Sequence, residues 1–164
     1  IKKKHKEIAY INISEKYNFA NERKLSFLRS LKQNNIKFNK NYYATVKLEE
    51  PEKSFEIIKK MLSINKKITA IICSTEFSAL SAIKACNNLD LKIGKDISII
   101  TFDGPVVESL TSPSLSAVTH PRKTLGLKAI EMLLEMDNKN YKPQFYLAKP
   151  KILDRGTVHT VEKT

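Results

Sequence analysis

The polar residues that could do chemistry in this chain stand just after apolar runs. Asp103 directly follows the run ISIITF, Thr75 lies two residues after TAIIC, and Arg23 follows EIAYINI with Phe19 in between. A carboxylate and a guanidinium pair with vicinal hydroxyl groups, and an aromatic ring can cover the apolar face of a sugar. These residue types therefore suit a polyhydroxylated small molecule.

Each candidate also has a purely structural interpretation. Asp103 could cap a turn, and Thr75 could be the N-cap of the next helix. Arg23 could be a surface helix residue, Phe19 could belong to the core, and His120 could be a loop residue. We favour the ligand role for Asp103, because it ends a central strand. For Thr75 we favour the N-cap, although both roles can coexist in one residue.

The elements that must position these residues alternate between strand and helix. Apolar runs and periodicity predict strands at 7–13, 42–48, 69–73, 97–102 and 115–119, and helices at 19–34, 54–64, 75–89 and 121–136. The tail around Pro150 alternates like two further short strands. Such an order favours an α/β fold, a parallel sheet with helices on both faces, whose strands place ligand groups at their carboxyl ends.

The composition is that of a globular protein with an excess of basic residues. The 164 residues fit one domain or part of one, and the net charge is +12. Only four of the 29 Lys and Arg residues are arginines, so we favour a solvated lysine coat over a nucleic-acid surface. No apolar run approaches the ~20 residues of a membrane span, and the start IKKKHKEIAYIN does not read as a signal peptide.

The chain lacks the motifs of common catalytic, metal and cofactor sites. Its four glycines form no G-x-G-x-x-G or phosphate loop, its three histidines lie far apart, and it has no G-x-S-x-G elbow. Cys73 and Cys86 lack zinc spacing and read as buried thiols of a reducing compartment. We therefore expect no enzyme activity, no cofactor and no metal, and a cytoplasmic location.

The ordered motifs resemble the lactose/galactose-repressor (LacI/GalR) family of transcription regulators. The resemblance lies in ITAIICSTEFSALSAIKACNNLDLKIGKDISIITFDG, in LTSPSLSAVTHPRKTLGLKAIEMLL, and in the earlier HKEIAYINI and NERKLSFLRSL. It implies a three-layer lobe of the periplasmic-binding-protein-like type. Residues 1–164 would be part of a sugar-binding effector domain, mainly its carboxyl-terminal lobe without that lobe's first strand and helix. The helix 121–136 would belong to the other lobe, and the DNA-binding domain would be absent.

The resemblance also implies roles for the candidate residues. Arg23 matches the family arginine that holds ligand hydroxyls, and Asp103 matches the ligand-binding aspartate. Phe19 falls where relatives contact the effector, and His120 falls near the crossover between lobes. Thr75 stands where the family usually has Asn, which puts its ligand contact in doubt.

Two further departures from the family pattern lie beside these residues. Glu76 stands where the family has Asp, and Gly104 replaces the second Asp of the family motif.

Two surfaces are expected to make contacts outside the lobe. The helix 75–88 carries small residues that allow close approach, and the resemblance implies a dimer interface there, because the matching helix of the family lies at one. Together with the segment 107–111 it is the candidate homodimer face, for which we name Ala79, Leu80, Ala82, Ile83 and Val107. Packing of this helix on the sheet would explain part of the same pattern. The apolar face of the helix 121–136 is expected to be buried by displacement, by swapping or by a second copy.

The resulting expectation is the effector-sensing part of a sugar-responsive regulator. A small carbohydrate would bind between two lobes, and DNA would be contacted only through the missing amino-terminal domain. A periplasmic sugar-binding protein of a transporter shares the two-lobe fold and is the alternative. A flavodoxin-like enzyme or receiver domain, and direct nucleic-acid binding by the lysine coat, are further possibilities that the motifs do not favour.

Overall fold

Six strands form one sheet in the order β2-β1-β3-β4-β5-β6. The computed structural model describes residues 1–103, 111–137 and 141–161. The elements are β1 (Ile8–Asn12), α1 (Asn18–Gln33), η1 (Lys40–Tyr42), β2 (Tyr43–Thr45), α2 (Pro51–Ile64), β3 (Ala70–Cys73), α3 (Glu76–Asn88), β4 (Ser98–Phe102), β5 (Ser116–Thr119), α4 (Arg122–Glu135) and β6 (Lys151–Leu153). Strands β1 to β5 pair in parallel and β6 pairs antiparallel with β5, so the α/β sheet is mixed rather than wholly parallel.

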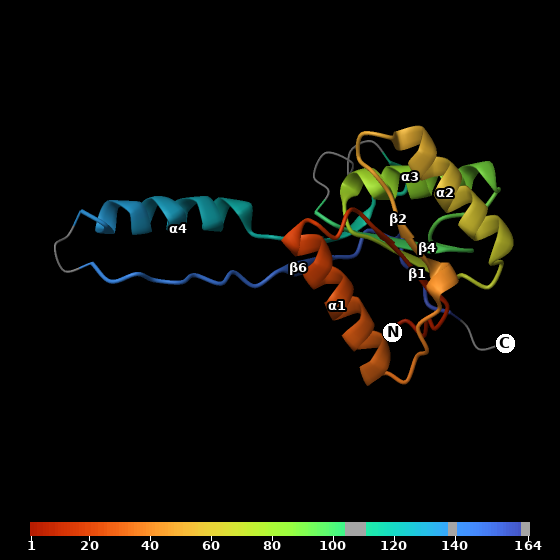
Figure 1. Ribbon diagram of the computed structural model, residues 1–164, viewed down its shortest axis with the longest axis horizontal. Coiled ribbons are helices and arrows are strands. Elements are labelled where there is room, and N and C mark those ends of the chain that lie inside the picture. Colours follow the sequence, from red (N-terminus) through yellow and green to blue (C-terminus); the bar gives the residue numbers. More distant parts are fainter. Residues whose placement is uncertain (104–110, 138–140, 162–164) are drawn as a thin grey trace.

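The helices cover the sheet as a three-layer architecture. Figure 1 shows α1 on one side of the sheet and α2 with α3 on the other. The pleat of β1 explains this arrangement, because Ile8 and Tyr10 pack toward Phe27 of α1. Ala9 and Ile11 belong to the larger core under α2 and α3. All five residues of the strand are buried, and all but Asn12 belong to one of these two cores, as expected for a strand buried on both faces.

Local signals set the ends of the helices. Pro51 is the first residue of α2, where its missing N–H costs nothing. Helix α1 stops before Asn35, which adopts a left-handed φ of 55°. Thr75 caps α3 through a reciprocal capping box with Ser78.

The small residues of α3 pack inside the lobe. Ala79 and Ala82 are fully buried in the core that α3 shares with α2 and the sheet, so their assignment to a dimer face is wrong. Their small side chains bring α3 close to its own neighbours, and they cannot touch a second copy. Leu80 and Ile83 are half-buried against the same core, and Val107 lies outside the described residues.

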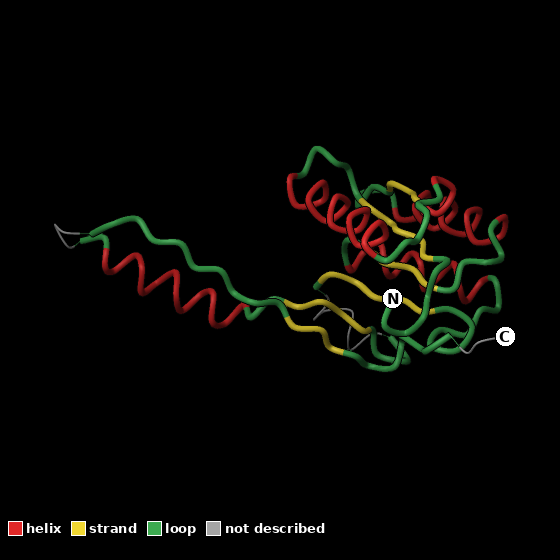
Figure 2. The backbone as a smooth tube through the Cα atoms, turned by 90° about the horizontal axis from the view of Figure 1, so that it is seen from below, coloured by secondary structure: helices red, strands yellow, loops and turns green. Residues whose placement is uncertain are grey.

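Helix α4 forms an arm that leaves the sheet. It has no buried residue, and the chain returns beside it as an extended segment from 141 to 150 (Figures 1 and 2). Leu133 and Leu134 are 69% and 72% exposed. The expectation that displacement onto the chain itself buries this apolar face is wrong, whereas burial by swapping or in a second copy stays a prediction.

The carboxyl-terminal tail also differs from the two short strands that its sequence predicts around Pro150. Phe145 and Leu147 alternate like a strand, but they lie in the extended return segment, 97% and 91% exposed, and are not assigned to a strand. Among the described residues of the tail, Lys151–Leu153 is the segment assigned as a strand of the sheet. A strand needs a hydrogen-bonded neighbour, and beside α4 the return segment has none among the described strands.

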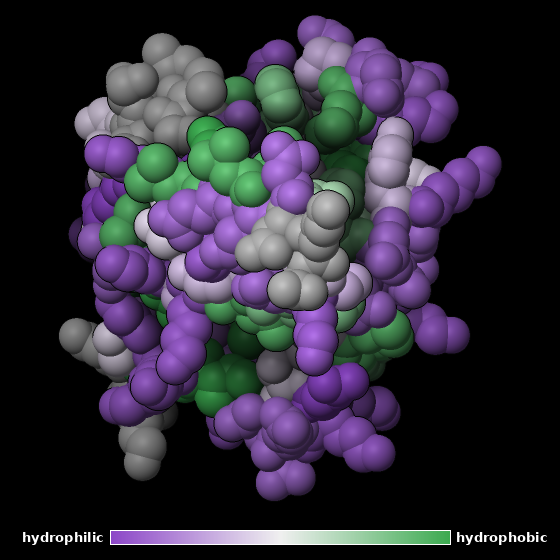
Figure 3. Space-filling model, turned by 90° about the vertical axis from the view of Figure 1, so that its left-hand side faces the viewer, coloured by the Kyte–Doolittle hydropathy of each residue, from purple (hydrophilic) through white to green (hydrophobic). Residues whose placement is uncertain are grey.

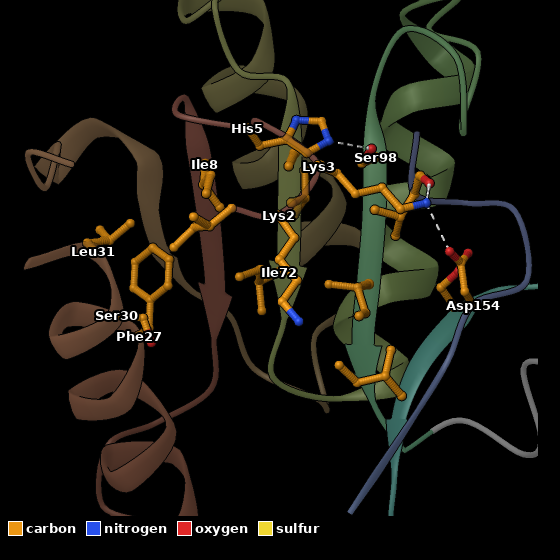
Figure 4. Close-up of a pocket in the computed structure, with 17 residues that line it drawn as sticks. Lys2, Lys3, His5, Ile8, Phe27, Ser30, Leu31, Ile72, Ser98 and Asp154 are labelled. Carbon is orange, nitrogen blue, oxygen red and sulfur yellow. Dashed lines mark hydrogen bonds and ion pairs between the residues drawn. The ribbon is translucent and has the colours of Figure 1, made fainter. Parts of the chain in front are cut away.

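One face of the sheet is only partly covered by the described residues. Beside α1 lies an apolar groove of 470 Å³, and Figure 4 shows Ile8, Phe27 and Ile72 on its walls. Its rim carries an ion pair of 2.9 Å between Lys3 and Asp154. Among the described helices, none is long and apolar enough to cross a membrane.

Candidate functional site

The carboxyl ends of β3 and β4 and the start of α1 meet around one open cavity. This cavity has a volume of 440 Å³ and lies where parallel sheets place ligand groups. Four of the five predicted site residues line it, namely Asp103, Arg23, Phe19 and Thr75. His120 does not line it and lies between β5 and the arm. The geometry therefore brings together residues that are 84 positions apart in the sequence.

Arg23 is held in one orientation by two aromatic rings and a backbone carbonyl. Its guanidinium carbon lies 5.0 Å from the ring centroid of Phe19 and 4.4 Å from that of Phe102. Its Nη1 donates to the carbonyl oxygen of Ser74 at 2.7 Å. Burial lowers the pKa of Arg23, and the charge of Asp103 acts in the opposite direction. Arg23 remains a cation at neutral pH, so its positively charged guanidinium group faces the cavity in a fixed orientation.

Asp103 keeps much of its capacity to accept hydrogen bonds. Its carboxylate oxygens lie 3.9 Å from Arg23 and 3.4 Å from Arg122, which is longer than a charge-assisted hydrogen bond of about 2.8 Å. Its backbone adopts φ 59° and its N–H donates to the carbonyl of Val118 at 2.8 Å. The carboxylate is therefore positioned by its backbone and left free to receive hydroxyl groups.

Phe19 lines the cavity and does not belong to the buried core. It is 44% exposed and stacks on Tyr17, with the ring centroids 5.9 Å apart. Phe19 and Phe102 both contact the Arg23 guanidinium with their ring faces, so they form an aromatic cluster at the cavity, and such rings can contact the apolar face of a sugar.

Thr75 serves as a helix cap, as its sequence context predicts. Its hydroxyl accepts from the backbone N–H of Ser78 at 3.2 Å and lies 3.1 Å from the hydroxyl of Ser78. These contacts occupy most of the hydrogen-bonding capacity of the hydroxyl. Its ligand contact stays a prediction.

Three polar residues that were not among the predicted site residues also line the cavity. Ser74 and Glu76 flank Thr75 at the end of β3, and Arg122 begins α4. The position of Ser74 and Glu76 after a predicted strand was a visible signal, but only Thr75 matched the ligand position of the resembling family. Arg122 falls in the helix that the resemblance assigns to the other lobe.

The larger groove on the sheet face lacks such convergent chemistry. Its walls are mostly apolar, with isoleucine the commonest residue, and several of its polar groups bond to one another, as Figure 4 shows for His5 and Ser98. The cavity at the strand ends combines guanidinium, carboxylate and aromatic groups instead. We therefore take the strand-end cavity as the candidate site. Within the described residues, no group of three or more His, Cys, Asp or Glu could hold a metal ion.

Comparison with known proteins places the chain in a family. The model of the periplasmic binding protein-like domain matches residues 1–158. The transcriptional repressor PurR of Actinobacillus pleuropneumoniae is 30% identical over 162 residues, which is 97% of this chain and 48% of that repressor. The solved structure of the Escherichia coli transcriptional repressor AscG matches with a TM-score of 0.85 at 25% identity, over 96% of this chain and 57% of that one.

A second solved structure agrees with this match. It is a sugar-binding transcriptional regulator of the LacI family from Escherichia coli, complexed with phosphate, with a TM-score of 0.82 at 25% identity. The similarity covers 97% of this chain and 57% of that protein. The chain thus spans about half the length of these relatives. It belongs to the periplasmic binding protein-like domain family, in the LacI/GalR group of transcription regulators.

Proposed function

We propose that this chain is the effector-sensing part of a sugar-responsive transcription regulator. The observation that carries the proposal is the open cavity in which Asp103 and Arg23 face each other beside Phe19 and Phe102. A sugar presents vicinal hydroxyls to the two charges and an apolar face to the rings. The match to a sugar-binding regulator and to repressors named PurR supports this role.

In this proposal the cavity is one half of a binding cleft. A second lobe, supplied by the part of the protein that corresponds to the rest of the relatives' length, closes over the ligand, and α4 packs its apolar face on that lobe. The ligand favours one arrangement of the lobes only through its higher affinity for that arrangement. DNA is then contacted by a separate amino-terminal domain, so the protein acts in the cytoplasm and catalyses no reaction.

Calorimetry of the full-length protein with a panel of neutral monosaccharides and disaccharides tests the site. Asp103→Asn should weaken binding of the saccharide that binds the wild type by about tenfold or more, since it removes a charged hydrogen-bond acceptor. Asp90→Asn is the matched control, because Asp90 also has a positive φ, of 56°, and it is exposed and lies outside the cavity. Equal affinities for the Asp103→Asn and wild-type proteins would remove Asp103 from the site.

The regulator is further proposed to be a homodimer. With Ala79 and Ala82 buried, Leu80 and Ile83 remain as the partly accessible candidates on α3. Leu80→Glu in the full-length protein should lower the molar mass measured by light scattering from the dimer to the monomer value. An unchanged dimer would place the interface elsewhere.

A periplasmic sugar-binding protein of a transporter is the second candidate, because the matched domain family carries the periplasmic binding protein-like description. The two functions predict different behaviour of the full-length protein. A regulator shifts a specific DNA fragment in a gel, and the shift changes with saccharide. A transporter component binds the saccharide and leaves DNA unshifted.

A further inference from the structure

Four buried side-chain atoms have no hydrogen-bond partner among the described residues, and two of them belong to residues that line the strand-end cavity. These two are the hydroxyl oxygen of Ser74 and the Oε2 carboxylate oxygen of Glu76, and both atoms are buried. Ser74 as a whole is 0% exposed. Buried polar side-chain atoms in proteins are nearly always paired, because an unpaired one keeps the full cost of its desolvation.

The neighbouring groups of the chain are already committed elsewhere. Arg23 donates to the carbonyl oxygen of Ser74 rather than to its hydroxyl. Thr75 and Ser78 bond to each other through the capping box of α3. Ser78 is as buried as Ser74, at 1% exposure, yet its hydroxyl donates to the Thr75 carbonyl at 2.8 Å. Two serines four residues apart thus differ in that only one has a structural partner.

We propose that Ser74 and Glu76 form a second hydrogen-bonding subsite beside Asp103 and Arg23, and that this subsite selects an uncharged saccharide over a phosphorylated or acidic one. The inference rests on the proposed function and deepens it by naming the charge of the ligand. A carboxylate only accepts hydrogen bonds, so Glu76 requires a donor such as a sugar hydroxyl. Ser74 can donate or accept and so adapts to the next hydroxyl of the same ring.

The charges around the cavity also favour an uncharged saccharide. Its lining carries two guanidinium groups, Arg23 and Arg122, and two carboxylates, Asp103 and Glu76. Both guanidinium groups lie near Asp103, at 3.9 and 3.4 Å, and no cation within ion-pair distance neutralises Glu76 among the described residues. An anionic ligand group near Glu76 would therefore be repelled, whereas a hydroxyl group would be held.

The first test needs no ligand and compares two buried serines in this chain. Ser74→Ala should leave the midpoint of urea unfolding unchanged or raise it, because it removes an unpaired polar atom. Ser78→Ala should lower the midpoint, because it removes the hydrogen bonds that cap α3. A loss of stability in Ser74→Ala as large as that in Ser78→Ala would show that the Ser74 hydroxyl has a structural partner, and would overturn the proposal.

The second test uses calorimetry of the full-length protein with glucose, galactose and cellobiose, and with glucose 6-phosphate and galactose 6-phosphate. Glu76→Gln keeps the shape of the side chain, removes its charge, and should weaken binding of the neutral saccharide by about tenfold to a hundredfold. It should also narrow the preference for the neutral sugar over its phosphate, because the repulsion of the anion is gone.

The outcomes separate this inference from the proposed function. If the wild type binds a saccharide and Asp103→Asn weakens it while Glu76→Gln does not, the subsite is wrong and the proposed function stands. If a sugar phosphate binds the wild type more tightly than its neutral counterpart, the charge selection is wrong. If no saccharide of the panel binds the wild type, the proposed function fails, and the inference fails with it.

Discussion

We expect the stability of this chain to depend on pH through a buried histidine network around His5. His5 is 4% exposed, and its Nδ1 lies 2.9 Å from the hydroxyl of Thr69. Its Nε2 lies 3.0 Å from both the carbonyl oxygen of His159 and the hydroxyl of Ser98. These hydrogen bonds connect the first residues of the chain to its carboxyl-terminal segment and to β4. Protonation of His5 should therefore weaken the packing of the two terminal segments on the sheet.

Burial lowers the pKa of His5 below its ordinary value of 6.5, and the nearby charge of Lys3 acts in the same direction. Just below pH 6.5, His5 is therefore protonated in the unfolded chain but still neutral in the folded chain. The free energy of unfolding should fall as the pH drops through 6.5, and it should level off below the folded pKa. One proton limits this slope to about 1.4 kcal/mol per pH unit.

Urea unfolding between pH 8 and pH 5 measures this slope, and a nuclear magnetic resonance titration reads the His5 ring directly. His5→Gln should flatten the slope around pH 6, whereas His120→Gln, a change outside the network, should retain it. Gln in this buried position can lower the overall stability, so the slope rather than the absolute value is compared. A His5 ring that titrates at or above 6.5 in the folded chain would refute the reasoning.

Three further outcomes follow from burial and bonding. Ile71→Ala should cost about 2–5 kcal/mol in urea unfolding because Ile71 is fully buried, whereas Leu134→Ala, on the exposed arm, should change stability by less than about 0.5 kcal/mol. Thr157→Val should cost about 2 kcal/mol in the same assay, because the Thr157 hydroxyl bonds buried backbone groups of β4 and β5 at 2.7 and 2.9 Å. Burial raises the pKa of Cys73, and that of Cys86 to about 12, so a thiol reagent at pH 8 should label both only after unfolding.

The lobe could be predicted from the sequence because its local signals agree with its packing. The run EIAYINI carries apolar residues on both of its faces, and β1 is buried on both faces between α1 on one side and α2 with α3 on the other. The proline that starts α2 and the threonine that caps α3 act where the sequence places them. Periodicity identified the buried side of α2, because its apolar Ile58, Met61 and Leu62 recur at helical spacing and are buried in the structure.

The arm and the dimer face could not be predicted in the same way. An apolar stripe shows that a helix needs a partner, and it does not show which partner. In α4 the stripe finds none within the described chain, and in α3 the small residues face the sheet rather than another copy. Side chains that pack inside and side chains that pack between molecules have the same composition, so only the arrangement in space distinguishes them.

The candidate site was predictable as far as the topology of parallel strands determines it. Asp103, Arg23 and Thr75 meet because strand ends converge on one edge. No pattern in the sequence predicts that the Ser74 hydroxyl and the Glu76 Oε2 lack a partner. Whether a polar atom is hydrogen-bonded depends on where each neighbouring donor points. Those directions, such as the donation of Arg23 to a carbonyl rather than to a hydroxyl, exist only in the folded chain.

The backbone of Asp103 decides which substitution can test the site cleanly. Its φ of 59° is left-handed, a conformation that Asn tolerates and that costs other residues about 1–2 kcal/mol. Its contacts to Arg23 and Arg122 are long, and its side chain is 33% exposed, so these ion pairs contribute only about 0–1 kcal/mol.

Asp103→Asn should therefore be nearly neutral in urea unfolding of this chain, and Asp103→Ala should cost about 1 kcal/mol more. The difference between the two variants isolates the backbone cost from the loss of the carboxylate. An affinity lost in Asp103→Asn then reports the carboxylate alone, because the fold around it is unchanged. If Asp103→Asn destabilised the chain as much as Asp103→Ala, the carboxylate would be holding the fold, and its loss would no longer identify a ligand contact.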